Sequence, residues 1–240
     1  DLLKTTNLDA QQSRYVQVAS ASGEILLEHV NDALDITRIE AGVMSLSPEV
    51  FSLQSTVSRV TDVLRTLAEE KNLTLTVNFD PTMKRSFFAA GVRVNQILTN
   101  LIGHALKFTD EGEIIVEVTG IHGPKKTEAR ISVIDTGPGI APDEQEAIFE
   151  DFVALAQPTG RQKRGDGLGL SISRKVARLM KGDLNVQSEV GKGSTFVLTL
   201  PLERAEAEMT EQETPPTEEA SVKRSILIVE DNMINRSVLR

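Results

Sequence analysis

Four polar residues recur at helical spacing in the segment RVNQILTNLIGHALKFTDEG, residues 93–112. Gln96, Asn100 and His104 are four residues apart, and Lys107 follows three residues later. Residues separated by three or four positions share one face of an α-helix. A face that carries amide, imidazole and ammonium groups could hold a metal–phosphate group. It could equally be the solvated face of an amphipathic helix.

A second candidate segment, DTGPGI at residues 135–140, follows an apolar run that is typical of a strand. The carboxylate of Asp135 could accept a hydrogen bond from an exocyclic amine. Gly137 and Gly139 would allow the backbone to turn sharply and to approach a ligand closely. Taken alone, the segment is also compatible with a plain turn.

The third segment, GDGLGLSISRKVARLM at residues 165–180, places three glycines directly before a predicted helix: Gly165, Gly167 and Gly169. Backbone N–H groups at a helix start attract anions, and glycine lets phosphate oxygens come close. The segment resembles a dinucleotide-binding fingerprint only loosely, because a loop rich in glycine, lysine and arginine precedes it instead of a strand. The cations of that loop could steer a polyphosphate or could simply be solvated.

Helices and strands must bring these segments together. Alternating apolar residues predict strands, and apolar residues spaced by three and four predict amphipathic helices. The predicted strands are 51–53, 73–79, 114–118, 129–134, 184–186 and 196–200. The predicted helices are 57–67, 94–105 and 168–180, the last with Gly182 at a C-cap position. Because helices and antiparallel-type hairpins are both present, we expect an α+β sandwich and not a doubly wound parallel sheet.

Residues 9–42 are predicted to form one long helix ahead of this framework, with Gly42 as its stop signal. Apolar and small residues within it alternate at spacings of three and four, which is typical of a coiled-coil or helix-bundle seam. The residues of this seam are Leu27, Val30, Leu34, Thr37 and Ala41. We expect the helix to pack on a partner helix; the alternative is a surface helix packed on its own domain.

The composition excludes several classes of protein. The 240 residues carry a net charge of −9, which argues against non-specific binding to nucleic acid or to an anionic membrane. The absence of cysteine excludes disulfides, thiolate metal sites and cysteine catalysis. No apolar run approaches the roughly 20 residues that a membrane helix needs, so we expect no membrane contact by this chain.

The last part of the chain differs from the rest. Residues 203–222 hold seven Glu and one Arg, a net charge of −6, and are predicted to be a solvated linker. Ser225 to Val229 then form a new apolar strand without a partner. Because a lone strand is not a domain, we expect the chain to stop inside a further domain. Because the sequence starts at Asp1 and not at Met, we also expect further residues upstream of it.

Together, the segments are more specific than any one of them. An Asn-bearing helix, a DTGPGI turn, a glycine-rich lid and a GSTF strand, in that order, resemble the ATP-binding domain of sensor histidine kinases. That domain has the Bergerat fold, shared with gyrase, heat-shock chaperone ATPases and MutL. LLEHVNDALDITRIEAG resembles the second helix of the family's dimerisation hairpin, and IFEDFVALAQ its phenylalanine box. SILIVEDNMINRSVL resembles the start of a receiver domain.

The resemblance implies a piece of a hybrid sensor histidine kinase with four parts. Residues 1–45 would be part of the dimerisation and phosphoacceptor hairpin, and 46–202 the ATP-binding catalytic domain. Residues 203–224 would be an acidic linker, and 225–240 the start of the receiver domain.

The family's functional residues can be carried over position by position. Asp135 would bind the adenine amino group, the lid glycines would border the phosphates, and Phe149 and Phe152 would anchor the lid. The implied cofactors are ATP and Mg²⁺. The implied nucleotide-binding residues are Asn100, His104, Lys107, Asp135, Gly137, Gly139, Gly165, Gly167, Leu168, Gly169 and Thr195. The implied metal positions are Asn100 and His104, with the acidic pair Glu230 and Asp231 in the receiver piece.

Two residues depart from the family pattern. His104 occupies the position of the asparagine that usually binds Mg²⁺, and Asp166 a position that often holds threonine. Mg²⁺ prefers oxygen ligands, whereas imidazole suits softer metals, so His104 could weaken Mg²⁺·ATP binding or act through a water. A carboxylate beside a triphosphate is repulsive unless a cation intervenes.

The phosphoacceptor histidine of the family is absent, so no catalytic residue is assigned and we expect no autophosphorylation by this chain. His29 is expected at the seam edge or surface of the long helix, and His122 in a solvent-exposed loop.

The resemblance implies a catalytic module of two-component phosphorelay signalling that positions ATP for transfer to a histidine elsewhere. It further implies a homodimer through a helical bundle, and a receiver domain in cis and a phosphotransfer protein as partners. The implied location is the cytoplasm, with the parent protein free or tethered to the inner membrane. The alternative is a degenerate kinase that acts as an interaction or scaffold module. A chaperone- or gyrase-type ATPase is disfavoured, because position 100 is Asn rather than the Glu that activates water in those enzymes.

Overall fold

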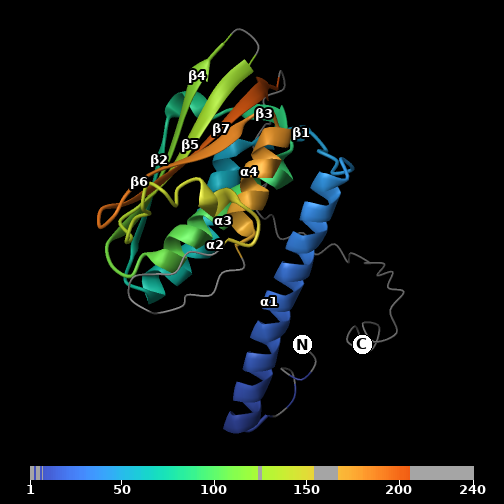
Figure 1. The fold of residues 1–240 in the computed structure, drawn as a ribbon, viewed down its shortest axis with the longest axis vertical. Helices are drawn as coiled ribbons and strands as arrows, with labels where there is room; N and C mark the ends of the chain where they lie inside the picture. Colours follow the sequence, from blue (N-terminus) through green and yellow to red (C-terminus); the bar gives the residue numbers. More distant parts are fainter. Residues whose placement is uncertain (1–2, 4–5, 7, 124–125, 154–166, 206–240) are drawn as a thin grey trace, which may run out of the picture. The chain divides into compact units, whose positions relative to one another are not determined.

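The computed structural model describes residues 3, 6, 8–123, 126–153 and 167–205 (Figure 1). The chain divides into two compact units, one made of Asp1–Glu28 with Thr210–Arg240, and one of His29–Met209. The second unit contains the segments singled out above that lie among the described residues.

A seven-stranded sheet forms the framework of this larger unit. Its strand order is β1–β3–β7–β5–β4–β2, and β6 pairs with β7. The pair β2–β4 is parallel, and the other described pairs are antiparallel. The strands are β1 Glu49–Ser52, β2 Thr74–Phe79, β3 Ser86–Ala89, β4 Glu113–His122, β5 Lys126–Asp135, β6 Asp183–Glu189 and β7 Gly193–Arg204. The expected α+β fold is confirmed.

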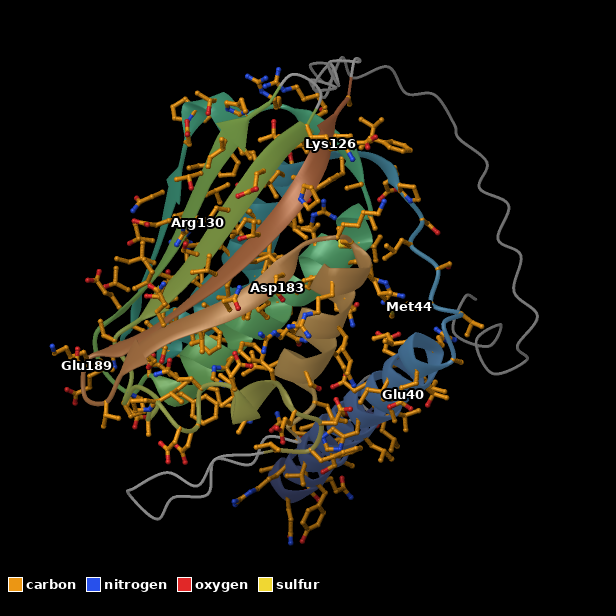
Figure 2. All side chains as sticks on the ribbon, turned by 45° about the horizontal axis from the view of Figure 1, so that its top comes forward. Glu40, Met44, Lys126, Arg130, Asp183 and Glu189 are labelled. Atoms are coloured by element: carbon orange, nitrogen blue, oxygen red, sulfur yellow. The ribbon has the colours of Figure 1, made fainter. Side chains whose placement is uncertain are left out.

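Three helices pack on one face of this sheet: α2 (Leu53–Glu70), α3 (Gly91–Phe108) and α4 (Gly169–Leu179) (Figure 1). Successive residues of a strand point to opposite faces. Along β5, every second residue from Thr127 to Asp135 is therefore buried, whereas Glu128 and Arg130 are exposed. Figure 2 shows Arg130 on the open face of the sheet. This alternation places Asp135 on the face that the helices cover.

Several boundaries differ from those predicted by periodicity. Phe51 and Leu53 do not share a strand, because the Oγ of Ser52 accepts a hydrogen bond from the Ser55 N–H (3.1 Å) and caps α2. The strand β3, only four residues long, was not predicted. The β4–β5 hairpin extends to His122, and β7 continues through Arg204, two residues into the predicted linker.

The long helix α1 spans Ala10–Glu40 and is followed by Gly42 at φ 66°. Its seam residues Leu27, Val30 and Leu34 are exposed by 64%, 47% and 47%. The last turns of α1, which belong to the larger unit, lie against α3. There the carboxylate of Asp35 accepts hydrogen bonds from Gln96 Nε2 (2.8 Å) and Arg93 Nη1 (3.3 Å).

The end of α4 corrects the C-cap prediction for Gly182. The left-handed residue is Lys181 (φ 64°), and the Gly182 N–H donates to the Ala177 carbonyl at 2.9 Å. Gly182 is required for a different reason: a Cβ there would overlap the carbonyl of Thr199 on β7 and lie 2.8 Å from Leu200 Cδ2. Glycine therefore lets the chain pass close to β7.

We predict opposite effects for substitutions at these two positions. Gly182→Ala should destabilise the domain by about 1–3 kcal/mol, because its methyl group clashes with the β7 backbone. Lys181→Gly should stabilise it by up to about 1 kcal/mol by relieving the left-handed backbone. Urea unfolding of both variants measures the two effects. A destabilising Lys181→Gly would contradict the left-handed strain at Lys181, and a neutral Gly182→Ala would contradict the close approach of Gly182 to β7.

Candidate functional site

Asp135 is a buried carboxyl at the end of β5, only 6% exposed. Its Oδ1 accepts a hydrogen bond from the Gly137 N–H (2.9 Å). Burial raises the pKa of the Asp135 carboxyl above its ordinary value, while hydrogen bonds from the backbone of Gly137 and Ser194 oppose this rise. A carboxylate offers about four lone-pair positions, so Asp135 can accept a further donor from a ligand.

The space beside Asp135 is kept free by Gly137. A Cβ at Gly137 would lie 2.8 Å from Asp135 Oδ1 and 3.4 Å from Thr109 Oγ1. Thr109 is fully buried, and its Oγ1 has no hydrogen-bond partner among the described residues. A buried hydroxyl without a partner costs about 1–3 kcal/mol, so this is a place for a water or a ligand atom. Sequence reasoning missed Thr109; its position just after the predicted helix was the available signal.

Asn100 joins α3 to α4. Its Nδ2 donates hydrogen bonds to the Gly169 carbonyl and to the Ser173 Oγ, both at 3.2 Å. The polar face of α3 is therefore not simply solvated, because its central residue holds the first turn of α4. Gln96, one turn earlier on the same face, is bound by Asp35 and Arg93. Asn100 and Gly169, two of the predicted site residues, are thus in contact, and Ser173 is an addition to the set.

His104 lies at the border between the polar and apolar faces of α3. Its ring centroid is 4.4 Å from that of Phe108 and 5.3 Å from that of Phe196, which it meets edge-on. Its Nδ1 is buried and has no hydrogen-bond partner within the described part of the chain. Removal from water, helped by the nearby Lys107 ammonium, lowers the pKa of His104 to about 4. The imidazole is therefore neutral at pH 7.

Other predicted residues lie around the start of α4 and the end of α3. Lys107 is in the last turn of α3, with Nζ 5.6 Å from the centroid of the Phe108 ring. Gly167 is left-handed (φ 67°), and a Cβ there would lie 2.6 Å from the backbone N of Val153. Leu168 is buried directly before α4. Four predicted or questioned residues lie outside the described part of the chain: Gly165, Asp166, Glu230 and Asp231.

The strand alternation corrects the expectation for Thr195. Thr195 is paired with Ile134 and lies on the sheet face opposite to Asp135. Ser194 is instead the residue directly opposite Asp135, and its Oγ lies 3.0 Å from the Ser188 Oγ. The hydroxyl on the helix-covered face at this end of β7 is therefore that of Ser194.

The structure also gives the surroundings of the last predicted glycine, Gly139, and of the two phenylalanines expected to anchor the lid. Gly139 (φ 71°) packs against the β6–β7 turn, where a Cβ would lie 2.9 Å from Val190 Cα. Figure 2 shows Glu189 at this end of the sheet and Lys126 at the other. Phe149 is buried, with the Arg174 guanidinium 4.5 Å from its ring centroid. Phe152 is 72% exposed, and residues 154–166 of the lid that it was expected to anchor lie outside the described part of the chain.

Comparison with known proteins identifies this arrangement. Residues 89–204 match the family described as "Histidine kinase-, DNA gyrase B-, and HSP90-like ATPase". The crystal structure of full-length ShkA in complex with AMPPNP superposes with a TM-score of 0.72 and 34% sequence identity. That match covers 86% of this chain and 42% of the ShkA chain. This chain contains the ATP-binding catalytic domain of a histidine kinase.

Curated relatives agree with this assignment. The autoinducer 2 sensor kinase/phosphatase LuxQ of Vibrio cholerae is 37% identical over 238 residues, covering 98% of this chain and 28% of LuxQ. Hybrid signal transduction histidine kinase L of Dictyostelium discoideum is 37% identical over 202 residues, 83% of this chain and 12% of that protein. The chain thus spans less than a third of the length of either relative. The resemblance to hybrid sensor histidine kinases is confirmed.

The histidine kinase domain should lose stability with falling pH because of His104. Its pKa is about 4 when folded, against 6.5 for a free imidazole, so the unfolded chain takes up the proton first. The free energy of unfolding should therefore fall as the pH drops from 6.5 to 4. The contribution is on the order of 2–3 kcal/mol. Urea unfolding across this range measures it.

His104→Asn removes the titrating group, so the variant should lose this share of the pH dependence. His122→Asn, in the exposed β4–β5 hairpin, is the matched control and should retain it. Equal pH slopes for His104→Asn and the unmodified chain would contradict the assignment.

Proposed function

We propose that this chain binds ATP between α3, α4 and the end of β5, and presents its γ-phosphoryl group to a histidine outside the chain. The buried carboxyl of Asp135 is the observation that carries the proposal. A buried acceptor with free lone pairs is costly unless a donor meets it, and the exocyclic amine of adenine is such a donor. Guanine presents a carbonyl oxygen at the corresponding position, which the carboxylate would repel.

The phosphates would lie at the N-terminal end of α4. No side-chain hydrogen bond caps this helix at Leu168, within the described residues, so the first N–H groups remain for an anion. Gly167 and Gly169 let the phosphates approach the backbone closely. Lys107, at the end of α3, would add positive charge. These groups would hold the γ-phosphoryl group in place while an incoming imidazole attacks it.

Mg²⁺ fits the described residues only in part. Among them, no group of three His, Asp or Glu residues could hold a metal. Asn100 offers one amide oxygen, whereas the neutral His104 offers nitrogen, which Mg²⁺ disfavours. Protein-bound Mg²⁺ usually keeps several waters and binds substrate phosphates. We therefore infer that Mg²⁺ would arrive with ATP, neutralise phosphate charge and take Asn100 Oδ1 as its oxygen from the chain.

The acceptor histidine would lie outside this chain. His104 packs between aromatic rings of the site, and both ring nitrogens of His122 are hydrogen-bonded, to Thr127 and Thr82. His29 is on α1, the helix that resembles the second helix of the dimerisation hairpin. We infer that the intact protein is a hybrid sensor kinase in which this domain phosphorylates the first helix of that hairpin.

The partners follow from the same proposal. The exposed seam of Leu27, Val30 and Leu34 would pair with a second copy in a four-helix bundle. The receiver domain that would begin at 225–240, outside the described residues, would take the phosphoryl group in cis on an aspartate beyond this chain and pass it to a phosphotransfer protein. No described helix has the length and hydropathy to cross a bilayer. Because its substrate would be cytoplasmic ATP, we place this domain in the cytoplasm, with the parent protein free or tethered at the inner membrane.

The experiment that tests ATP binding is the substitution Asp135→Ala. ATP affinity should fall by about 10- to 100-fold, since the adenine amine loses a charged, buried acceptor. Calorimetric titration with ATP and with GTP measures the loss and its base specificity. Asp62→Ala, at an exposed carboxylate on α2, is the control and should bind ATP normally. Unchanged affinity of Asp135→Ala for both nucleotides would overturn the site assignment.

A second candidate function, a degenerate kinase that serves as an interaction module, is favoured by His104. Its imidazole occupies the position of the metal-binding asparagine and packs against Phe108 and Phe196. In this case ATP would bind without gaining affinity from Mg²⁺, and His104→Asn would restore phosphoryl transfer in the intact protein. ATP affinity that rises on addition of Mg²⁺ to the unmodified chain would exclude the candidate.

A further inference from the structure

Ser173 lies on the second turn of α4, with only 1% of its surface exposed. Its Oγ accepts a hydrogen bond from Nδ2 of Asn100, 73 residues earlier in the chain, at 3.2 Å. The same Nδ2 donates to the Gly169 carbonyl, also at 3.2 Å. One side-chain amide therefore has both of its N–H groups directed at α4.

These two contacts determine which way round the Asn100 amide lies. A backbone carbonyl only accepts hydrogen bonds, so the amide nitrogen, and not the oxygen, must face Gly169. The Ser173 hydroxyl occupies the second N–H. The oxygen Oδ1 is left without a hydrogen bond from any described residue. Because Ser173 itself is buried, water does not replace its hydroxyl at low cost.

We propose that Ser173 is a positioning residue of the nucleotide site. It holds the Asn100 amide so that Oδ1 remains available as a hard oxygen for a metal–phosphate group. The inference rests on the proposed binding of ATP between α3 and α4. Because His104 brings nitrogen to the neighbouring position, Asn100 Oδ1 is the amide oxygen on which metal-dependent binding would depend.

Ser171 provides a matched control in the same helix. It is also fully buried, but its Oγ donates to the Leu168 carbonyl of its own turn and does not contact Asn100. Ser171→Ala therefore removes a buried hydroxyl from α4 without freeing the amide. Ser173→Ala removes one of the two hydrogen-bond acceptors of the Asn100 amide. Ser173→Cys also weakens that acceptor, because sulfur is a weak acceptor, and it changes the side-chain volume little.

The test is the affinity of the full chain for ATP, measured by calorimetry in Mg²⁺ and in EDTA. Ser173→Ala and Ser173→Cys should weaken binding in Mg²⁺ by about five- to tenfold, the loss expected for one buried hydrogen bond. Binding in EDTA should change less than about twofold. Ser171→Ala should leave the ratio of the ATP affinities in Mg²⁺ and in EDTA as it is in the unmodified chain. Ser173→Thr, which keeps the hydroxyl, should show the same ratio as the unmodified chain.

A second readout needs no nucleotide. In ¹H–¹⁵N spectra, the side-chain amide protons of Asn100 should exchange with water faster in Ser173→Ala than in Ser171→Ala. Equal losses in Mg²⁺ and EDTA, or equal effects of the two alanine variants, would show a packing role and overturn the inference. Absence of ATP binding by the unmodified chain would instead overturn the proposed function.

Discussion

β5 and β7 are hydrogen-bonded over ten residue pairs, from Lys126 with Glu203 to Asp135 with Ser194, and the register of this pairing decides which side chains meet the helices. A shift by one residue would turn every side chain of β5 to the opposite face. Asp135 would then leave the covered face and lose its place beside α3. The alternation of buried Ala129, Ile131 and Val133 specifies the register, because a slip would expose them. Hydrophobic burial in the sheet thus positions the carboxyl.

Side chains on successive turns of α3 connect this helix to the other elements of the site. Gln96 binds Asp35 at the end of α1, and Asn100, one turn later, binds α4. His104, one turn further, lies against Phe196 of β7. Hydrogen bonds are directional, so those of Gln96 and Asn100 fix an angle as well as a distance. The helix that would bind metal–phosphate therefore also connects the last turns of α1, the first turn of α4 and the sheet.

Local patterns in the sequence predicted most of this framework but not its contacts. Periods of 2 and 3.6 revealed β2, α2, α3 and the β4–β5 hairpin, and the DTGPGI turn pointed to Asp135. The sequence pointed to Thr195 and not to Ser194, the residue opposite Asp135, because the register of a strand depends on its neighbours. The position of Gly182 after a helix predicted a cap. Its actual role, close packing against Thr199, depends on a tertiary contact that the local sequence does not reveal. Ser173 could not be predicted, because no local pattern reveals its contact with α3.

The central claim is that one adenine nucleotide lies against both Asp135 and Asn100. Titration of the ¹⁵N-labelled chain with a non-hydrolysable ATP analogue in Mg²⁺ tests it most directly. The signals of the Gly137 backbone amide, which is hydrogen-bonded to Asp135, and of the Asn100 side-chain amide should shift together with one dissociation constant. Shifts confined to other residues, with both of these signals unmoved at saturation, would contradict it.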